Sequence, residues 1–215
     1  MDFFLDTADI AAVRMFEGAG LLDGVTTNPS LVAGAERRAD FHGLVKQICD
    51  AVKKPVSAEV LASDADEMIA EAKTLAAISE HVVVKLPATA DGVKTIGLCT
   101  AKGIRTNATL AFQPLQALAA AKAGAAYVSL FLGRLDDIGQ DAIMLLHAIR
   151  GIYSRYGFGT KILAASIRHP LHVVRAAEAG ADAATMPPTV MAKLLDHPLT
   201  KAGLDRFSAD WGGRP

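Results

Sequence analysis

The stretch Val82-Val83-Val84-Lys85-Leu86-Pro87 decides the fold class of this chain. Three consecutive β-branched residues favour a strand, and a run that is apolar on both faces is typical of the buried strands of parallel sheets. Lys85 stands out, because a buried ammonium loses hydration that the protein has to replace. Burial can lower the pKa of a lysine by up to about 3 units, which exposes the nucleophilic amine that Schiff-base chemistry requires. The alternatives are that Lys85 pairs with a carboxylate or extends its ammonium to the rim.

Short apolar strands alternate with helical segments along the chain. The predicted strands are Phe3–Asp6, Gly24–Thr27, Val56–Leu61, Val82–Leu86, Ile104–Ala108, Tyr127–Phe131, Lys161–Ser166 and Ala183–Met186. Eight strands in strict alternation with helices predict an α/β protein, a single closed (β/α)8 TIM barrel. An open, doubly wound sheet is the alternative, but no G-x-G-x-x-G follows the first strand, where a dinucleotide-binding version of that fold carries one.

Helices are expected between the strands. Clear examples are Ala65–Ile78, Leu110–Ala123 and Asp136–Tyr156. The last of these has apolar residues close to helical spacing at Ile138, Ala142, Leu145, Ile149 and Ile152. Two helices end in a similar device, Lys122-Ala123-Gly124-Ala125 and Glu178-Ala179-Gly180-Ala181. Glycine in these turns indicates a left-handed cap, which favours a residue without a Cβ atom.

The chain continues past the eighth strand. Pro188–Leu195 is predicted as the eighth helix, and Leu199–Trp211 as an extra C-terminal helix, so that residues 1–215 form one barrel domain with this addition. The extra helix has an apolar stripe made of Leu204, Phe207 and Trp211. Each large apolar side chain contributes roughly 1.5–3 kcal/mol when it is buried. We therefore expect the stripe to be covered, either by its own barrel or by a neighbouring subunit.

The composition excludes several classes of protein. A share of 51% hydrophobic residues with 21% charged residues is typical of a folded globular chain. The net charge of −1 and the lack of a basic run give no reason to expect nucleic acid or an anionic membrane as a partner. Neither a signal-length apolar run at the N-terminus nor a stretch near the ~20 apolar residues of a membrane span is present. The isolated Cys49 and Cys99 are expected to be buried free thiols of a cytoplasmic protein.

Polar side chains gather where the predicted strands end, which is the catalytic face of such barrels. They are Asp6, Asn28, Glu59, Lys85, Asn107, Thr109, Ser166 and Arg168. Structural alternatives remain: Asp6-Thr7 and Asp9 could cap the first helix, Asn28-Pro29-Ser30 could form a turn, and Glu59 could simply neutralise Lys85. Because side chains alternate along a strand, Ser57 shares a face with Glu59, and Asn107 with Thr109. Together, around one buried lysine, they predict a catalytic site.

A second polar group follows the sixth and seventh strands. Arg134, Ser166 and Arg168 can hold a phosphate group through forked, charge-assisted hydrogen bonds. Phosphate sites near the last loops are frequent in barrel enzymes. The alternative for Arg134 is a surface ion pair with Asp136 or Asp137, worth under about 1 kcal/mol. No carboxylate lies near Arg168 in the sequence.

The histidines predict no metal site. They are His42, His81, His147, His169, His172 and His197. Only His169 and His172 are close in sequence, and they lack the carboxylate pattern of a metal site. We expect neither a metal nor another cofactor.

Six stretches of this chain resemble the signatures of the small transaldolases. They are Phe4-Leu5-Asp6-Thr7-Ala8, Gly24-Val25-Thr26-Thr27-Asn28-Pro29-Ser30, Val84-Lys85-Leu86-Pro87, Thr106-Asn107-Ala108-Thr109-Leu110, Gly133-Arg134-Leu135-Asp136-Asp137 and Ala164-Ala165-Ser166-Ile167-Arg168. The resemblance runs essentially the full length of the chain and includes Asp205–Trp211. This family also contains fructose-6-phosphate aldolases, which share the fold and the lysine.

The resemblance implies a role for each of these side chains. Lys85 would form a Schiff base with the C2 carbonyl of a ketose phosphate, and Asp6 would take the C4 hydroxyl proton as the C3–C4 bond breaks. Glu59 and Thr109 would position a proton-carrying water. The remaining implied roles are contacts with the substrate: Asn28, Asn107 and Ser129 with its hydroxyls, and Arg134, Ser166 and Arg168 with its phosphate. The resemblance also implies a homo-oligomer, a pentamer or a decamer, with the C-terminal helix on a neighbour.

Two positions favour transfer over net cleavage. The aldolase branch of the family resembles a sequence with glutamine at the position of Glu59 and with tyrosine at the position of Phe131. The hydroxyl of that tyrosine could orient a water. The sequence is therefore interpreted as a transaldolase of the non-oxidative pentose phosphate pathway. Its ketose donor would be sedoheptulose 7-phosphate or fructose 6-phosphate, and its acceptor glyceraldehyde 3-phosphate or erythrose 4-phosphate. A fructose-6-phosphate aldolase and a non-catalytic sugar-phosphate-binding barrel are the alternatives.

Overall fold

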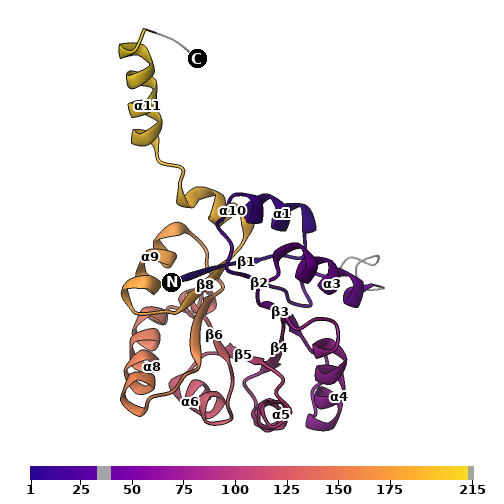
Figure 1. Cartoon of the computed structure of the whole chain (residues 1–215). Helices are drawn as coiled ribbons and strands as arrows, with labels where there is room; N and C mark the ends of the chain where they lie inside the picture. The colour runs from indigo at the N-terminus through magenta and orange to yellow at the C-terminus, as the bar shows by residue number, and fades with distance from the viewer. Residues whose placement is uncertain (33–39, 213–215) are drawn as a thin grey trace.

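The computed structural model describes residues 1–32 and 40–212, and its strands form a closed parallel barrel (Figure 1). The strands are paired in chain order, and β8 closes the barrel against β1. Their bounds are β1 Asp2–Asp6, β2 Gly24–Thr26, β3 Val56–Glu59, β4 Val82–Pro87, β5 Thr106–Ala111, β6 Tyr127–Phe131, β7 Lys161–Ala165 and β8 Ala183–Met186. The predicted (β/α)8 fold is confirmed.

Helices surround the barrel on its outside (Figure 1). Their bounds are α1 Ile10–Gly18, α3 Phe41–Val52, α4 Ala65–Ala76, α5 Ala90–Thr100, α6 Pro114–Lys122, α7 Leu132–Asp136, α8 Ala142–Tyr156, α9 Pro170–Glu178, α10 Pro188–Met191, the 3-10 turn η1 Ala192–Leu194 and α11 Pro198–Asp210. The glycines after α6 and α9 have the predicted left-handed conformation, with φ of 90° at Gly124 and 85° at Gly180. A side chain there would be strained, so the glycines allow the tight turn into the next strand.

The predicted helix Leu110–Ala123 is wrong at its start. Strand β5 continues to Ala111, and α6 begins only at Pro114. Leu110 has a φ of 57°, in the left-handed region, which no continuous helix or regular strand contains. The register of β5 against β6 shifts at this point. Proline is favoured in the first turn of a helix, and it fixes the start of α6.

The predicted helix Asp136–Tyr156 is also wrong at its start, because α7 ends at Asp136 and α8 begins only at Ala142. A turn separates α7 from α8, and Gly139 within it has a φ of 74°. The predicted apolar stripe is displaced as a result: Ile138 is 69% exposed, and the buried residues of α8 are Ala142, Leu146, Ile149 and Tyr153. A short α7 directly after β6 brings Arg134 to the end of the barrel where the strands finish.

Apolar side chains fill the N-terminal half of the barrel interior. They are Phe4, Val83, Tyr127, Leu163 and Ala183. The rings of Phe4 and Tyr127 lie 5.9 Å apart, within the range of favourable aromatic contact. A larger buried cluster lies between the strands and the helices. Because the lower interior is packed, polar side chains that point inward meet only at the C-terminal ends of the strands.

The strand register brings the predicted polar residues to the same level. Lys85 pairs with Glu59 on one side and with Asn107 on the other. On the neighbouring strands β1 and β2, Asp6 pairs with Thr26. Side chains at paired positions of neighbouring parallel strands point to the same face. The fold therefore supports one polar site inside the end of the barrel.

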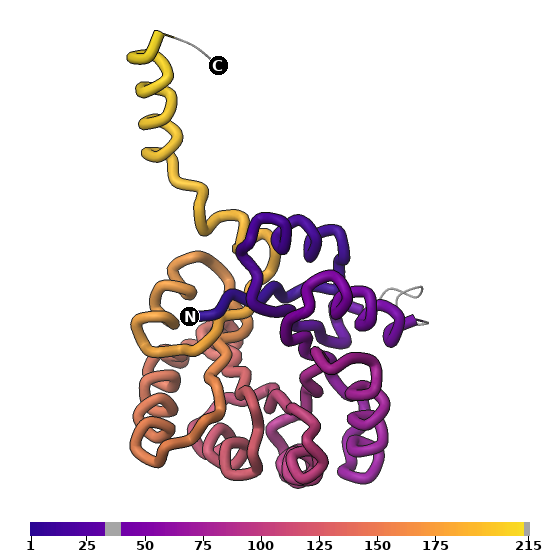
Figure 2. Tube along the Cα trace, in the orientation of Figure 1, coloured from indigo at the N-terminus to yellow at the C-terminus, as the bar shows by residue number. Residues whose placement is uncertain are grey.

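Helix α11 extends away from the barrel (Figures 1 and 2). Leu204, Phe207 and Trp211 are 63%, 69% and 80% exposed. The expectation that the barrel of the same chain covers this stripe is therefore wrong. Its contact with a neighbouring subunit stays a prediction.

Two further expectations bear on the environment of the protein. Cys49 and Cys99 are free and buried, as predicted. Among the described residues, no helix is both long and apolar enough to cross a membrane.

Candidate active site

A polar cavity of about 120 Å³ lies at the C-terminal ends of the strands. It is lined by Asp6, Thr26, Asn28, Lys85, Ser129, Phe131, Arg134, Ala165, Ser166 and Thr185. A larger hollow of about 380 Å³ lies between α1 and α3, but Arg14, Glu17 and Asp50 line it on the outside of the barrel. The first cavity brings together five of the side chains that the sequence singled out around Lys85 and the phosphate group: Asp6, Asn28, Lys85, Arg134 and Ser166. Glu59, Asn107, Thr109 and Arg168 do not line it.

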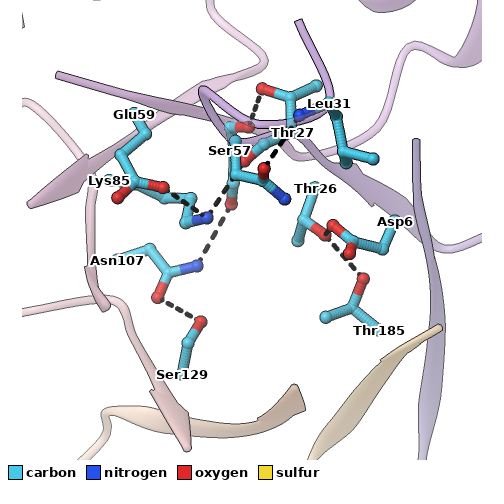
Figure 3. A network of polar contacts seen from close by, with 11 residues as sticks. Asp6, Thr26, Thr27, Leu31, Ser57, Glu59, Lys85, Asn107, Ser129 and Thr185 are labelled. Carbon is cyan, nitrogen blue, oxygen red and sulfur yellow. Dashed lines mark hydrogen bonds and ion pairs between the residues drawn. The ribbon is translucent and has the colours of Figure 1, made fainter. Parts of the chain in front are cut away.

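Lys85 is buried at the centre of this site (Figure 3). The residue is 4% exposed, and its ammonium lies 2.8 Å from Glu59 Oε2. The ammonium also donates a hydrogen bond to the Thr27 carbonyl at 3.0 Å. The prediction of a buried lysine is confirmed, and so is the pairing with Glu59. A buried ion pair contributes little net stability but is costly to break, because the remaining charge stays desolvated.

Asp6 faces the cavity from β1 and is held by a chain of hydroxyl groups. Thr26 Oγ1 donates to Asp6 Oδ1 at 2.7 Å, which leaves Thr185 Oγ1 to donate to Thr26 at 2.6 Å. Burial raises the pKa of Asp6, while the hydrogen bond from Thr26 and the positive charge of Lys85 lower it, and the charge of Glu59 raises it. The helix-capping alternative is confirmed for Asp9, whose side chain caps α1, and is wrong for Asp6.

Hydrogen bonds hold the side chain of Asn107, which lies next to Lys85 on the neighbouring strand. Ser129 Oγ donates to Asn107 Oδ1 at 2.8 Å, and Asn107 Nδ2 donates to Ser57 Oγ at 3.2 Å (Figure 3). Asn107 and Ser129 are both buried. A buried amide held on two sides keeps one orientation, which is what recognition of a substrate hydroxyl requires.

Asn28 lies in a turn and also borders the cavity. Its Oδ1 accepts a hydrogen bond from the Leu31 backbone N–H at 3.1 Å, so it does stabilise a turn. It also lines the cavity, and its side-chain NH₂ is then the group available to a ligand.

Thr109 is fully buried on β5, and its Oγ1 has no hydrogen-bond partner within the described part of the chain. A buried hydroxyl without a partner is rare in folded proteins, and most such groups bind water or a ligand. Thr109 does not line the cavity that Asp6 and Lys85 share.

The predicted phosphate-binding residues are only partly brought together. Arg134 and Ser166 line the cavity, and the guanidinium of Arg134 lies over the Phe131 ring, 4.8 Å from its centre. Arg168 instead pairs with Asp137 at 2.6 Å, with about half of each side chain exposed. The surface ion pair considered for Arg134 is thus made by Arg168. The chain brings a carboxylate to Arg168 from 31 positions away, which inspection of its sequence neighbours could not reveal.

Sequence reasoning missed Thr26 and Thr185. Both line the cavity, and both belong to the hydroxyl chain that ends on Asp6. A signal was present: Thr26 pairs with Asp6, and Thr185 shares a face with Ala183 inside the barrel. Two inward-facing hydroxyls on short apolar strands indicate a function inside the barrel rather than solubility.

No group of three or more His, Cys, Asp or Glu side chains within residues 1–32 and 40–212 is arranged to hold a metal ion.

Known proteins resemble this chain over nearly its whole length. The family model described as Transaldolase/Fructose-6-phosphate aldolase matches residues 3–212. A "probable transaldolase" of Methanococcus vannielii is 53% identical over 211 residues, which are 98% of this chain and 97% of that protein. A "probable transaldolase" of Syntrophobacter fumaroxidans is 53% identical over 213 residues, with coverage of 98% and 96%.

A solved structure supports the fold independently. The crystal structure of 3-hexulose-6-phosphate synthase matches with a TM-score of 0.66 at 16% identity, over 90% of this chain and 98% of that one. Identity this low shows a shared fold and nothing about the reaction. The family model and the relatives at about half identity go further, because they match nearly the whole chain in sequence. The chain belongs to the transaldolase/fructose-6-phosphate aldolase family.

Proposed function

We propose that this protein is a transaldolase, which transfers a dihydroxyacetone unit from a ketose phosphate to an aldose phosphate through a Schiff base on Lys85. The observation that carries the proposal is the ammonium of Lys85, buried at the end of the barrel and 2.8 Å from Glu59. A lysine held away from water, next to a group that can accept its proton, is suited to attack a carbonyl. The relatives named probable transaldolases support the same reaction.

The first step needs the lysine without its proton. Glu59 is in contact with the ammonium and is the nearest carboxylate to take that proton, directly or through a water. The free amine then attacks the C2 carbonyl of the ketose, and the carbinolamine loses water to give an iminium. Thr109 contributes a buried hydroxyl with an unused hydrogen-bonding capacity, which we assign to the water that carries protons in this step.

The second step breaks the C3–C4 bond. Asp6 takes the proton of the C4 hydroxyl, and the electrons of the breaking bond flow into the iminium to form an enamine. Burial raises the pKa of Asp6, so its carboxylate is a stronger base than a solvated one. The donor from Thr26 orients the carboxylate toward the cavity.

We assign the remaining polar residues of the cavity, together with Asn107 and Arg168 beside it, to binding of the substrate. We assign Asn28, Asn107 and Ser129 to the hydroxyls of the three-carbon fragment, since all three lie beside Lys85 or across from it. Arg134, Ser166 and Arg168 are assigned to the phosphate, with forked donors from the two guanidiniums. Arg168 would exchange Asp137 for the phosphate when substrate binds, because an exposed pair of this kind is weak.

Transfer is favoured over net cleavage by Phe131. Its ring lies under Arg134 and borders the cavity, and it carries no hydroxyl that could direct a water at the enamine. The enamine therefore persists until an aldose phosphate binds. It then adds to the aldehyde of this acceptor, and hydrolysis of the resulting iminium releases the product ketose phosphate.

Trapping and product analysis test the proposal. The protein is incubated with fructose 6-phosphate, reduced with borohydride, and mapped by mass spectrometry, with and without erythrose 4-phosphate. We expect a three-carbon adduct on Lys85, and a seven-carbon ketose phosphate only when erythrose 4-phosphate is present. Free dihydroxyacetone in the absence of acceptor would establish the aldolase instead. No adduct at all would establish a non-catalytic barrel.

Phe131→Tyr tests the choice between transfer and cleavage. A tyrosine hydroxyl at this position can orient a water toward the adduct, and one hydrogen bond of this kind is worth about 1 kcal/mol. We expect the ratio of released dihydroxyacetone to transferred product to rise roughly several-fold. The ratio is measured by quantifying both products. The control is Phe112→Tyr, since the centre of the Phe112 ring lies 5.8 Å from that of Phe131. An unchanged ratio contradicts the role assigned to Phe131.

Thr26→Val tests the hydroxyl chain through its effect on Asp6. The hydrogen bond from Thr26 lowers the pKa of Asp6, so its loss raises that pKa further. We expect the acidic limb of the pH profile of kcat/KM to move to higher pH, with roughly ten-fold lower activity at a pH on that limb and a smaller change on the plateau. Thr185→Val, one hydroxyl further away, should move the limb less. If the acidic limb of the pH profile lies at the same pH in the wild type, Thr26→Val and Thr185→Val, Asp6 is excluded as the titrating base.

The assembly is part of the proposal. The exposed stripe of α11 is the natural contact with a neighbouring copy, in a pentamer or decamer as the resemblance implies. Light scattering of the full chain measures the assembly, and a monomer at working concentrations contradicts it.

A further inference from the structure

His172 connects the two segments that carry the predicted phosphate ligands, and none of the steps above uses it. It lies in the first turn of α9 and is 5% exposed. Its Nε2 lies 2.8 Å from Asp136 Oδ2, at the end of α7. Its Nδ1 accepts a hydrogen bond from the Arg168 backbone N–H at 3.3 Å. One imidazole thus joins α7, which carries Arg134, to the loop after β7, which carries Arg168.

The same two segments touch at two further points. The Gly133 N–H donates to the Ser166 carbonyl at 3.1 Å, and Arg168 pairs with Asp137. Gly133 is required by this contact, because a Cβ atom there would lie 2.2 Å from the Ser166 carbonyl oxygen and 2.5 Å from Arg168 Nε. Ser166 has a φ of 57°, a conformation that a non-glycine residue keeps only when its surroundings impose it. The loop after β7 is therefore held in one position against α7.

We propose that His172, as a neutral imidazole, is a positioning residue that fixes the Ser166–Arg168 loop against α7, so that Arg134 and Arg168 can bind one phosphate together. This rests on the proposed function, since the phosphate is that of the proposed substrate. His172 itself does not touch the substrate. Two guanidiniums bind a phosphate well only at a fixed separation, and two separate segments supply them here.

The protonation state of His172 matters because both ring nitrogens are engaged. Nε2–H donates to Asp136, which leaves the Nδ1 lone pair for the Arg168 N–H. A second proton would place an N–H group against that N–H, so the contact with Arg168 would be lost while the contact with Asp136 remained. The groups that face the ring are Asp136 on α7, His169 and Arg175 on α9, and Arg168 on the loop.

Burial and the nearby His169 hold the pKa of His172 below its usual range, while Asp136 acts in the opposite direction. The ring is then neutral at neutral pH, and the contact with Arg168 is lost only as the pH falls through this lowered pKa. Anion binding should weaken in the same range.

Binding of inorganic sulfate tests this step apart from the chemistry at Lys85. Sulfate keeps its two charges between pH 8 and pH 5, so a change in affinity reports the protein. His172→Leu removes both hydrogen bonds, whereas His172→Gln keeps a donor for Asp136 and an acceptor for Arg168 but does not titrate. His147→Leu, at an exposed position on α8, is the matched control. Titration calorimetry measures the affinity, and circular dichroism checks the fold.

At pH 8 we expect His172→Leu to bind sulfate roughly ten-fold more weakly than the wild type, and His172→Gln within roughly three-fold of it. Toward pH 5 the wild type should lose affinity relative to His172→Gln. In the transfer assay, His172→Leu should raise KM for fructose 6-phosphate with little change in kcat. Borohydride trapping of unphosphorylated dihydroxyacetone on Lys85 should be unaffected.

The outcomes separate the two proposals. Equal sulfate affinity in the wild type and a folded His172→Leu overturns the role of His172 and leaves the proposed function intact. If His172→Leu does not fold, the pH series decides, and the same pH dependence in the wild type and His172→Gln overturns it. No sulfate binding by the wild type overturns the phosphate site itself, and loss of the adduct on Lys85 in the wild type overturns the proposed function.

Discussion

Replacing Lys85 by arginine should abolish transfer of the dihydroxyacetone unit, with a loss in kcat/KM of roughly 10⁴-fold or more. Arginine keeps a positive charge beside Glu59 and can still donate to the Thr27 carbonyl. It cannot lose its proton in a protein, so it cannot attack a carbonyl. The variant therefore removes the nucleophile while it retains the ion pair.

Activity in a coupled assay and trapping with borohydride measure this effect. Lys85→Met gives the same loss of activity without the charge, and it leaves Glu59 without its partner, so we expect it to be less stable than the arginine variant. Lys161→Met is the control, since Lys161 is half exposed and pairs with Asp2 at the other end of the barrel. If Lys85→Arg retained substantial activity, Lys85 would be a counter-ion rather than the nucleophile.

The arrangement of the strands could be predicted from short stretches of the sequence and their order along the chain. The run Val82–Val84 predicts a strand buried on both faces, and the ends of the predicted strands carry the polar residues Glu59, Lys85 and Asn107. The structure shows these three residues on adjacent strands at the same level. Strand neighbours in a barrel follow chain order, so a correct list of strands already predicts which strand ends meet.

Other features depend on contacts that sequence spacing does not encode. The prediction for the end of β5 is wrong because Leu110 adopts a left-handed conformation that its residue type does not favour. The carboxylate beside Arg168 comes from α7, and the hydroxyl that supports Thr26 comes from β8. Such partners are selected by the closed barrel, which brings its first and last strands together.

The apolar stripe on α11 illustrates the same limit. Its spacing on a helix is legible in the sequence, and the structure leaves it exposed. The spacing of apolar residues describes the helix alone. It carries no information on the surface that would cover the stripe.

Asp6→Asn should have two opposite effects, a loss of activity and a gain in stability. Without a general base for the C4 hydroxyl, we expect kcat to fall roughly 10²–10⁴-fold. The folded protein, however, carries an ionised Asp6 at neutral pH only against the cost of its burial, which raises the pKa of this carboxyl. Asparagine carries no charge and can still accept the hydrogen bond from Thr26.

The pH dependence of stability identifies the cause. Because burial raises the folded-state pKa of Asp6 above its ordinary value of 3.8, the protonated carboxyl favours folding below pH 3.8, and this contribution is lost as the pH rises through the raised pKa. The gain in the free energy of unfolding of Asp6→Asn should therefore be full at neutral pH and disappear toward pH 3.8. Each unit of the pKa shift corresponds to about 1.4 kcal/mol, so denaturant unfolding at several pH values measures the shift directly.

The matched control is Asp2→Asn on the same strand. Asp2 lies at the opposite end of β1 and pairs with Lys161, so its replacement should leave activity unchanged and should not stabilise the protein. Full activity of Asp6→Asn would show that another group accepts the proton. A general base kept ionised inside a barrel reduces the stability of the protein that carries it, so we expect the inactive variant to be the more stable one. An inactive variant that is less stable at neutral pH would contradict this, and would mean that the carboxylate of Asp6 supports the fold.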